Sequence, residues 1–319
     1  MNMVEARHLT VEYKGKNSLV RAVDNIGFTI AEGSITGLAG ESGCGKSSLV
    51  MALLRLIEHP NNVSGELVID GEKMLELSKR KLRGFRWKRI SVVFQSAMNS
   101  LDPVYTVRWQ IAEAIKAHKK ITKKELDGII RDLLSNVRID PEHRNDFPHE
   151  LSGGMKQRVS MAMAIALKPR FLIADEPTTA LDVVTQRQVL MLLKELREKH
   201  NMTVLIVSHD LSLLSEVCSN IMIMYAGKIA ESGTASEIVS APRHPYTKML
   251  IESIPSLYGK ERVLKPIPGS PPLLEMMPSG CRFHPRCPFA TQECRESEPP
   301  EVRFSDTHSA ACFHPTDGR

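Results

Sequence analysis

Residues 40–47 read Gly-Glu-Ser-Gly-Cys-Gly-Lys-Ser, and this stretch decides the fold of the 319-residue chain. It fits the pattern GxxxxGK[ST], follows an apolar run at residues 34–38 and precedes a predicted helix at residues 48–57. Glycines let successive backbone N–H groups face phosphate oxygens, and the helix start adds partial positive charge. Lys46 can reach the outer phosphates, and the Ser47 hydroxyl can bind Mg²⁺. The stretch predicts a nucleoside triphosphate site lined by Gly40, Glu41, Ser42, Gly43, Cys44, Gly45, Lys46, Ser47 and Ser48.

Short apolar runs alternate with helical stretches along much of the chain. They lie at residues 34–38, 90–94, 171–174, 203–207 and 221–225. Apolar strands of this kind are buried on both faces, which predicts a parallel sheet covered by helices. Shorter strands alternate with turns up to about residue 33, and the charged stretch at about 96–160 predicts an inserted helical subdomain.

A second anion-binding helix start is predicted at residues 151–158, Leu-Ser-Gly-Gly-Met-Lys-Gln-Arg. Ser152, Gly153 and Gly154 precede a predicted helix at residues 155–167. One subunit has no need of two such cradles for one triphosphate. The stretch resembles the signature of ATP-binding cassette (ABC) ATPases, with Met155 in place of the usual Gln. In that family the signature of one subunit caps the ATP held by its partner, so the resemblance implies a dimer.

The resemblance covers about residues 4–240 and implies an α/β fold, the P-loop NTPase ABC cassette. This fold has a RecA-like parallel-sheet core, an antiparallel β subdomain and a helical subdomain. By resemblance, Asp175 and Gln95 hold Mg²⁺ together with Ser47, and Glu176 polarises the attacking water. His209 matches the switch histidine that contacts the γ-phosphate.

Two further residues complete the site that the resemblance implies. Tyr13 is placed like the aromatic residue that stacks on adenine. Asp182, in Ala180-Leu181-Asp182, is placed like the residue of the D-loop, which links the two sites across the dimer. Because Lys46, Glu176 and His209 are all present, we expect hydrolysis and not ATP binding alone.

Residues 241–319 are rich in proline and predict a small, loop-rich C-terminal extension. Residues 244–247, 266–272 and 280–287 resemble the C-terminal region of dipeptide and oligopeptide permease ATPases. Residues 94–107, FQSAMNSLDPVYTV, are also similar to that family, although many members carry Asp-Pro where this chain has Ser96-Ala97. The resemblance implies an ATPase subunit of an importer of dipeptides or oligopeptides. Importers of oligosaccharides or nickel use related machinery and remain alternatives.

Four cysteines in the extension have the spacing C-x₅-C-x₆-C-x₁₇-C, at Cys281, Cys287, Cys294 and Cys312. They supply enough thiolates for one tetrahedral metal or a four-iron cluster. The spacing is wider than in zinc ribbons. In the permease family such cysteines are associated with a [4Fe–4S] cluster, so we expect that cluster, with zinc or four unliganded thiols as alternatives. The neighbouring His284, His308 and His314 are expected to be surface residues.

The composition is that of an ordinary folded protein, with 42% apolar and 25% charged residues. The net charge of +5 is too small to argue for nucleic acid, but it suits an anionic membrane face. No run approaches the roughly 18 apolar residues of a membrane span, and the N-terminus has no signal region. We therefore expect a peripheral subunit on the cytoplasmic face of the cell membrane. Its expected partners are a second ABC ATPase in a heterodimer, two integral membrane permease subunits and an extracytoplasmic substrate-binding protein.

A basic run at residues 79–89, which includes Phe85 and Trp87, suggests nucleic acid as a rival partner. A soluble ABC ATPase of DNA repair or translation is the rival class of function. Repair members carry long coiled coils and translation members usually carry two cassettes, whereas this chain has one cassette and no sustained heptads. We interpret the run as a solvated basic edge and expect no nucleic-acid partner.

Overall fold

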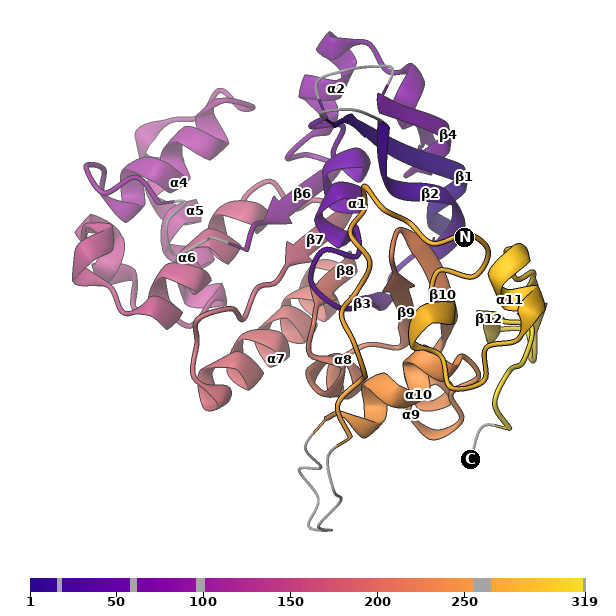
Figure 1. Cartoon of the computed structure of the whole chain (residues 1–319). Coiled ribbons are helices and arrows are strands. Elements are labelled where there is room, and N and C mark those ends of the chain that lie inside the picture. Colours follow the sequence, from indigo (N-terminus) through magenta and orange to yellow (C-terminus); the bar gives the residue numbers. More distant parts are fainter. Residues whose placement is uncertain (16–18, 58–61, 96–100, 255–264, 318–319) are drawn as a thin grey trace.

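The computed structural model describes residues 1–15, 19–57, 62–95, 101–254 and 265–317. Its centre is an eight-stranded sheet with the strand order β11-β12-β10-β9-β3-β8-β7-β6 (Figure 1). The five parallel strands are β3 (Ile35–Ala39), β6 (Ile90–Val93), β7 (Phe171–Asp175), β8 (Thr203–Ser208) and β9 (Asn220–Tyr225). Nearly all of their residues are buried, as expected for strands covered on both faces. The predicted parallel sheet is confirmed.

A second, antiparallel sheet has the strand order β2-β1-β4-β5. It consists of β1 (Asn2–Lys14), β2 (Leu19–Ala31), β4 (Val63–Ile69) and β5 (Glu72–Lys73). Buried and exposed residues alternate along most of β2, as in a sheet with one face on the core. That core is shared with helix α1 (Lys46–Leu53), whose Leu49 and Val50 belong to the same apolar cluster as Val11 and Phe171. The short η2 (Met74–Glu76) and α2 (Lys79–Phe85) follow this sheet.

The helical subdomain stands apart from the antiparallel sheet, on the opposite side of the molecule in Figure 1. It contains α4 (Val107–Lys116), α5 (Lys123–Asn136), η3 (Pro141–Asn145), η4 (Pro148–Glu150) and α6 (Gly153–Ile165). Helix α5 begins at a capping box, in which Thr122 and Glu125 satisfy each other's backbone N–H groups. The first residues of the predicted range, 96–100, lie outside the described part of the chain.

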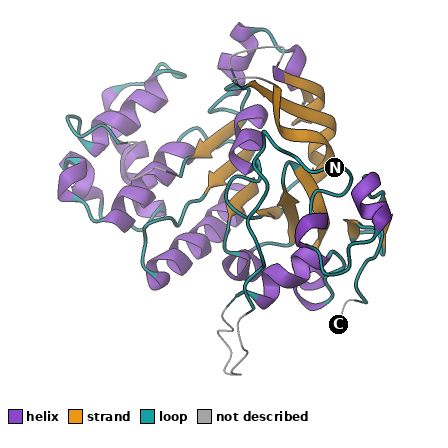
Figure 2. Cartoon of the chain, in the orientation of Figure 1, coloured by secondary structure: helices purple, strands orange, loops and turns teal. Residues whose placement is uncertain are grey.

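Two more helices, α7 (Val183–His200) and α8 (Leu211–Val217), connect strands of the central sheet (Figure 2). Helix α7 ends at Asn201, which takes the left-handed conformation common at a helix end. Among the described residues, none of the helices combines the length and the apolar character that a membrane crossing requires.

The C-terminal extension adds two strands to the central sheet. It follows β10 (Lys228–Thr234) and α9 (Ala235–Ser240) and contains α10 (Pro245–Glu252), η5 (His284–Arg286), α11 (Gln292–Glu296), β11 (Glu301–Arg303) and β12 (Ser309–Ala311). Strand β12 pairs with β10 in the registers Glu231↔Ala310 and Ser232↔Ser309. The division into a cassette up to residue 240 and an extension from residue 241 remains a prediction. The central sheet contains strands from both parts, because β12 of the extension pairs with β10 of the cassette.

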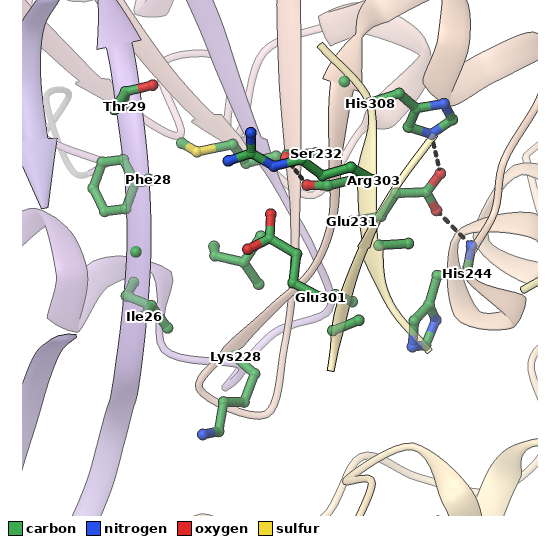
Figure 3. A pocket seen from close by; sticks show the side chains of 18 of the residues that line it. Ile26, Phe28, Thr29, Lys228, Glu231, Ser232, His244, Glu301, Arg303 and His308 are labelled. Atoms are coloured by element: carbon green, nitrogen blue, oxygen red, sulfur yellow. Dashed lines mark hydrogen bonds and ion pairs between the residues drawn. The ribbon is translucent and has the colours of Figure 1, made fainter. Parts of the chain in front are cut away.

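A buried carboxylate joins the extension to β10. Glu231 accepts hydrogen bonds from the backbone N–H groups of Arg243 and His244, at 2.7 and 2.8 Å, and its Oε1 lies 2.7 Å from Nε2 of His308 (Figure 3). Glu231, His244 and His308 line one side of a cavity of about 780 Å³, with Ile26 and Phe28 of β2 on the other. The surface position expected for His308 is wrong, because its ring pairs with this carboxylate and is only 4% exposed.

Candidate nucleotide site

The glycine-rich loop, residues 40–47, connects β3 to α1 as the sequence predicts. Gly40 and Gly45 have φ angles of 155° and 107°, which side chains rarely adopt. A Cβ atom would lie 2.2 Å from the Met224 carbonyl oxygen at Gly40 and 2.1 Å from the Ala22 carbonyl oxygen at Gly45. Both positions therefore require glycine, because the loop packs directly against the backbone of neighbouring strands.

Lys46 lies at the first turn of α1 and is only 6% exposed. Its Nζ donates hydrogen bonds to the backbone carbonyls of Gly40 and Glu41, at 2.7 and 3.0 Å. The ammonium group therefore folds back over the loop that it follows. The neighbouring Ser47 is exposed at the same helix start.

Asp175 ends β7 and is also buried. Among the residues that the structure describes, no group forms a hydrogen bond with its Oδ1 atom. Burial, reinforced by the neighbouring Glu176, raises the pKa of the Asp175 carboxyl to about 6, and the Lys46 ammonium opposes this rise. A buried carboxylate oxygen without a partner, within the electrostatic influence of the Lys46 ammonium, fits the oxygen ligands that Mg²⁺ takes beside phosphates.

Glu176 lies at the centre of a polar cluster at the carboxyl edge of the central sheet. Its Oε2 atom accepts hydrogen bonds from Gln95 Nε2, at 2.7 Å, and from Thr179 Oγ1, at 3.0 Å. The Nδ1 atom of His209 lies 3.5 Å from Oε1. The structure therefore brings Gln95, Glu176 and His209 together, because each follows a parallel strand that ends at this edge.

Ser152 and Asp182 each cap a helix. The Ser152 hydroxyl accepts from the N–H of Met155 at the start of α6, and Asp182 accepts from the N–H and hydroxyl of Thr185 at the start of α7. The bonds from Thr185 lower the pKa of the Asp182 carboxyl. These helix starts are neighbours, since a Cβ on Gly154 would lie 3.0 Å from Thr185 Cγ2. Helix α6 lies with α4 and α5, whereas α1 lies beside the antiparallel sheet (Figure 1).

Tyr13 lies near the end of β1 and packs, partly buried, against the apolar cluster around α1. It pairs with Val20 of β2, two residues before Ala22, whose carbonyl oxygen packs against Gly45. The predicted adenine-stacking residue is thus positioned by the strand that borders the glycine-rich loop.

Two residues of the extension contact the loop, and no pattern in the sequence predicts this contact. The N–H of Glu41 donates to the Tyr246 hydroxyl at 3.0 Å, and the Glu41 carboxylate pairs with Arg286. Both partners lie within stretches that carried the family resemblance. A single sequence cannot reveal a contact between positions 245 residues apart, because no local pattern links them.

The four predicted cluster ligands line one small cavity. Cys281, Cys287, Cys294 and Cys312 surround a space of about 10 Å³ together with His244, His284 and His314. Burial raises the pKa of the Cys287 thiol to about 11 and that of the Cys312 thiol to about 12, and the neighbouring thiols add to both shifts. No group of three or more Cys, His, Asp or Glu side chains in the described ranges is arranged to hold a metal ion. The structure therefore does not support the cluster as it stands.

Several residues of the basic run at residues 79–89 pack against, or form hydrogen bonds with, the rest of the protein. The Phe85 ring is buried, so it offers no stacking surface. Arg86 donates to the carbonyls of Leu54 and Arg55, and Arg89 pairs with Asp70. These contacts favour a structural basic edge over a nucleic-acid interface.

Comparison with known proteins is consistent with this geometry. The family model described as "ABC transporter" matches residues 23–179, and the model described as "Oligopeptide/dipeptide transporter, C-terminal region" matches residues 230–294. The chain is 42% identical to the dipeptide transport ATP-binding protein DppD of Escherichia coli strain K12, over 99% of this chain and 98% of that protein. It is 44% identical to DppD of Haemophilus influenzae, over 99% of this chain and 96% of that protein.

Solved structures share the fold. The ATP-binding cassette MJ0796, in a dimeric post-hydrolysis state bound to ADP and Pi, matches with a TM-score of 0.66 and 29% identity, over 73% of this chain and 99% of that chain. The cassette cbiO1 of Clostridium perfringens, part of the ABC transporter complex cbiONQ, matches with a TM-score of 0.65 and 25% identity, over 74% of this chain and 90% of that chain. The predicted ABC cassette fold is confirmed.

Proposed function

The chain belongs to the family of ATP-binding proteins of peptide ABC transporters, and from this premise we propose that it hydrolyses ATP to power the import of dipeptides or oligopeptides. The observation that carries the proposal is the cluster of Gln95, Glu176 and His209 beside Lys46 and Asp175. A chain that only bound nucleotide would not need a carboxylate and a histidine at this edge.

Glu176 is the group that orients and deprotonates the attacking water. Two donors, Gln95 and Thr179, occupy its Oε2 atom, which leaves Oε1 available to accept a hydrogen bond from water. His209 lies beside Oε1, where it can contact the γ-phosphate. The water attacks the γ-phosphorus, the bond to the β,γ-bridging oxygen breaks, and the proton passes to the carboxylate as ADP and phosphate form.

Lys46 and the N–H groups of residues 40–48 bind the phosphates of ATP. The Lys46 ammonium exchanges its present carbonyl partners for phosphate oxygens when nucleotide enters. Mg²⁺, when bound, neutralises charge on the β- and γ-phosphates. Ser47, Gln95 and the unpaired carboxylate oxygen of Asp175 are the residues that would hold it.

The complete site needs a second cassette. Ser152, Gly153 and Gly154 form a capped helix start that would face the ATP of the partner, and Asp182 lies on the adjacent helix start. The dimeric state of the MJ0796 cassette supports this arrangement. We propose a heterodimer at the cytoplasmic face of the membrane, bound to two permease subunits and supplied by an extracytoplasmic binding protein.

The peptide cargo follows from the relatives, which are named as dipeptide, oligopeptide or peptide transport proteins. The test is uptake of a radiolabelled dipeptide by proteoliposomes that contain the complete transporter and its binding protein. ATP-dependent uptake supports the proposal. Uptake of nickel or an oligosaccharide instead would contradict the peptide assignment, and salt-sensitive binding of DNA or RNA by the cassette would favour the rival class.

We also propose that the four extension cysteines take a [4Fe–4S] cluster, with zinc as the alternative. The support is that all four thiols line one cavity. The four thiols would have to move closer together as a metal binds, because in the described residues no three of the potential ligands are placed to hold a metal ion. Iron and zinc contents are measured on anaerobically purified protein, with Cys287→Ser as the variant and the remote, buried Cys218→Ser as the control. About four irons, lost only in Cys287→Ser, support the cluster. Zinc without iron, or no metal, contradicts it.

A further inference from the structure

The glycine-rich loop carries an acidic residue that is neutralised from the C-terminal extension. The Arg286 guanidinium forms a fork with the Glu41 carboxylate, with Nη1 2.7 Å from Oε2 and Nη2 3.1 Å from Oε1. The Arg286 side chain is 5% exposed and that of Glu41 is 25% exposed. Bidentate arginine–carboxylate pairs are directional and strong when shielded from water.

Arg286 is itself held in place by the extension and the central sheet. Its Nε donates to the Pro268 carbonyl at 2.8 Å, and Nη1 also contacts the Tyr225 hydroxyl at 3.3 Å. The buried Tyr246 hydroxyl accepts the N–H of Glu41, so both the backbone and the side chain of this loop residue are held by the extension.

A second arginine of the same segment supports the other flank of the loop. Arg282 donates to the Ala226 carbonyl and to the Asp24 carboxylate. The next residue in that turn, Gly227, donates its N–H to the Cys44 carbonyl at 2.8 Å. Residues 282–286 therefore brace the loop at two points, directly at Glu41 and through the turn at Cys44.

We propose that Arg286 is a positioning residue of the ATP site, which acts through Glu41 and makes the C-terminal extension part of that site. The inference rests on the proposed function, because the ligand is ATP. The incoming triphosphate is strongly anionic, so an unpaired Glu41 carboxylate on the wrapping loop would repel it. The arginine fork removes this repulsion and fixes the direction of the loop N–H groups.

The test measures the Kd of the full-length protein for Mg²⁺ and the fluorescent analogue MANT-ATP, together with KM and kcat for ATP in the assembled transporter. The variants are Arg286→Met, Glu41→Gln and the double variant. Arg243→Met is the matched control, because Arg243 is an extension arginine whose side chain contacts Phe304 and Thr316 and not the loop. Thermal melting without nucleotide reports on folding.

The expected result is that Arg286→Met raises Kd and KM about tenfold, equal to about 1.4 kcal/mol, with kcat within twofold. Glu41→Gln alone changes Kd less than threefold, and in the double variant it restores most of the affinity, because the unpaired charge is gone. Arg243→Met lowers the melting temperature but leaves Kd unchanged. A purely structural role for Arg286 predicts no rescue by Glu41→Gln.

Two results would overturn the inference while leaving the proposed function intact: wild-type affinity in Arg286→Met, or a double variant that binds no better than Arg286→Met. If Arg286→Met does not fold, Arg286→Lys replaces it, because lysine keeps the charge but not the fork. Arg286→Lys is expected to raise Kd about threefold, and wild-type affinity there counts against the inference. Failure of the wild type to hydrolyse ATP would instead contradict the proposed function.

Discussion

Gln95 donates a hydrogen bond of 2.7 Å to the carboxylate of Glu176, although the two residues are 81 positions apart. The contact joins the ends of β6 and β7, which are neighbours in the parallel sheet. It holds one carboxylate oxygen and, under the role proposed for Glu176, leaves the other oxygen to face the attacking water. The same glutamine follows the strand that leads toward the helical subdomain, so movement of that subdomain can change the orientation of Glu176.

Replacing Gln95 should therefore slow hydrolysis more than it weakens binding. We expect Gln95→Ala to lower kcat on the order of tenfold to a hundredfold, because the carboxylate loses its orientation. Steady-state phosphate release at saturating ATP measures the effect. Thr179→Val, which removes the weaker donor to the same oxygen, is the comparison and should cost less. Equal kcat values in Gln95→Ala and wild type would contradict the role of this contact.

Glu176→Gln should bind ATP normally and trap it. An amide cannot take a proton from water, so kcat is expected to fall by about 10² to 10⁴. Nucleotide retained after rapid gel filtration, compared between the variant and wild type, separates binding from chemistry. Turnover at the wild-type rate would show that another residue is the base.

The buried His244 predicts a loss of stability in acid. Burial lowers the pKa of its ring to about 4, and the neutral Nδ1 accepts the N–H of Tyr246 at the start of α10. Below the unfolded pKa of about 6.5, His244 binds a proton in the unfolded chain but stays neutral in the folded protein. The free energy of unfolding therefore falls as pH falls toward 4.

Between pH 7 and pH 5 this residue should lower the free energy of unfolding by about 2 kcal/mol. Denaturant unfolding at the two pH values, compared with His244→Asn, isolates the effect, because asparagine can cap the helix but does not titrate. The same pH dependence in both proteins would exclude His244 as the source.

Glu231 should be a strong determinant of stability. Both oxygens of the Glu231 carboxylate accept hydrogen bonds, so the amide of Glu231→Gln would place its N–H₂ group against at least one hydrogen-bond donor. We expect the free energy of unfolding to fall by about 2–4 kcal/mol. The exposed Glu301→Gln on β11 should stay within about 0.5 kcal/mol of wild type. Thermal or denaturant unfolding checks both. A free energy of unfolding in Glu231→Gln equal to that of wild type would mean that the surrounding residues rearrange to accept the amide, and would contradict the prediction.

The sequence predicted those parts of the site that depend on local pattern. The glycine-rich pattern at residues 40–47 predicts a turn followed by a helix start, and the apolar run before Asp175 predicts a buried strand. The proximity of Gln95, Glu176 and His209 could be anticipated because parallel strands end at one edge of a sheet. The fork between Glu41 and Arg286 could not, since nothing near either residue specifies a partner so distant in the chain. The surface position predicted for His308 is wrong, because the sequence of a loop-rich segment does not indicate the buried carboxylate that this histidine contacts.

The pairing of β12 with β10 bears on where this protein can be cut. A fragment that stopped at residue 240 would contain every motif of the cassette, yet it would leave β10 as a bare sheet edge and Glu231 without the donors from Arg243, His244 and His308. Unpaired strand edges recruit other chains, so such a fragment should aggregate on expression. The shortest stable unit of this protein is then longer than the part that carries out its chemistry.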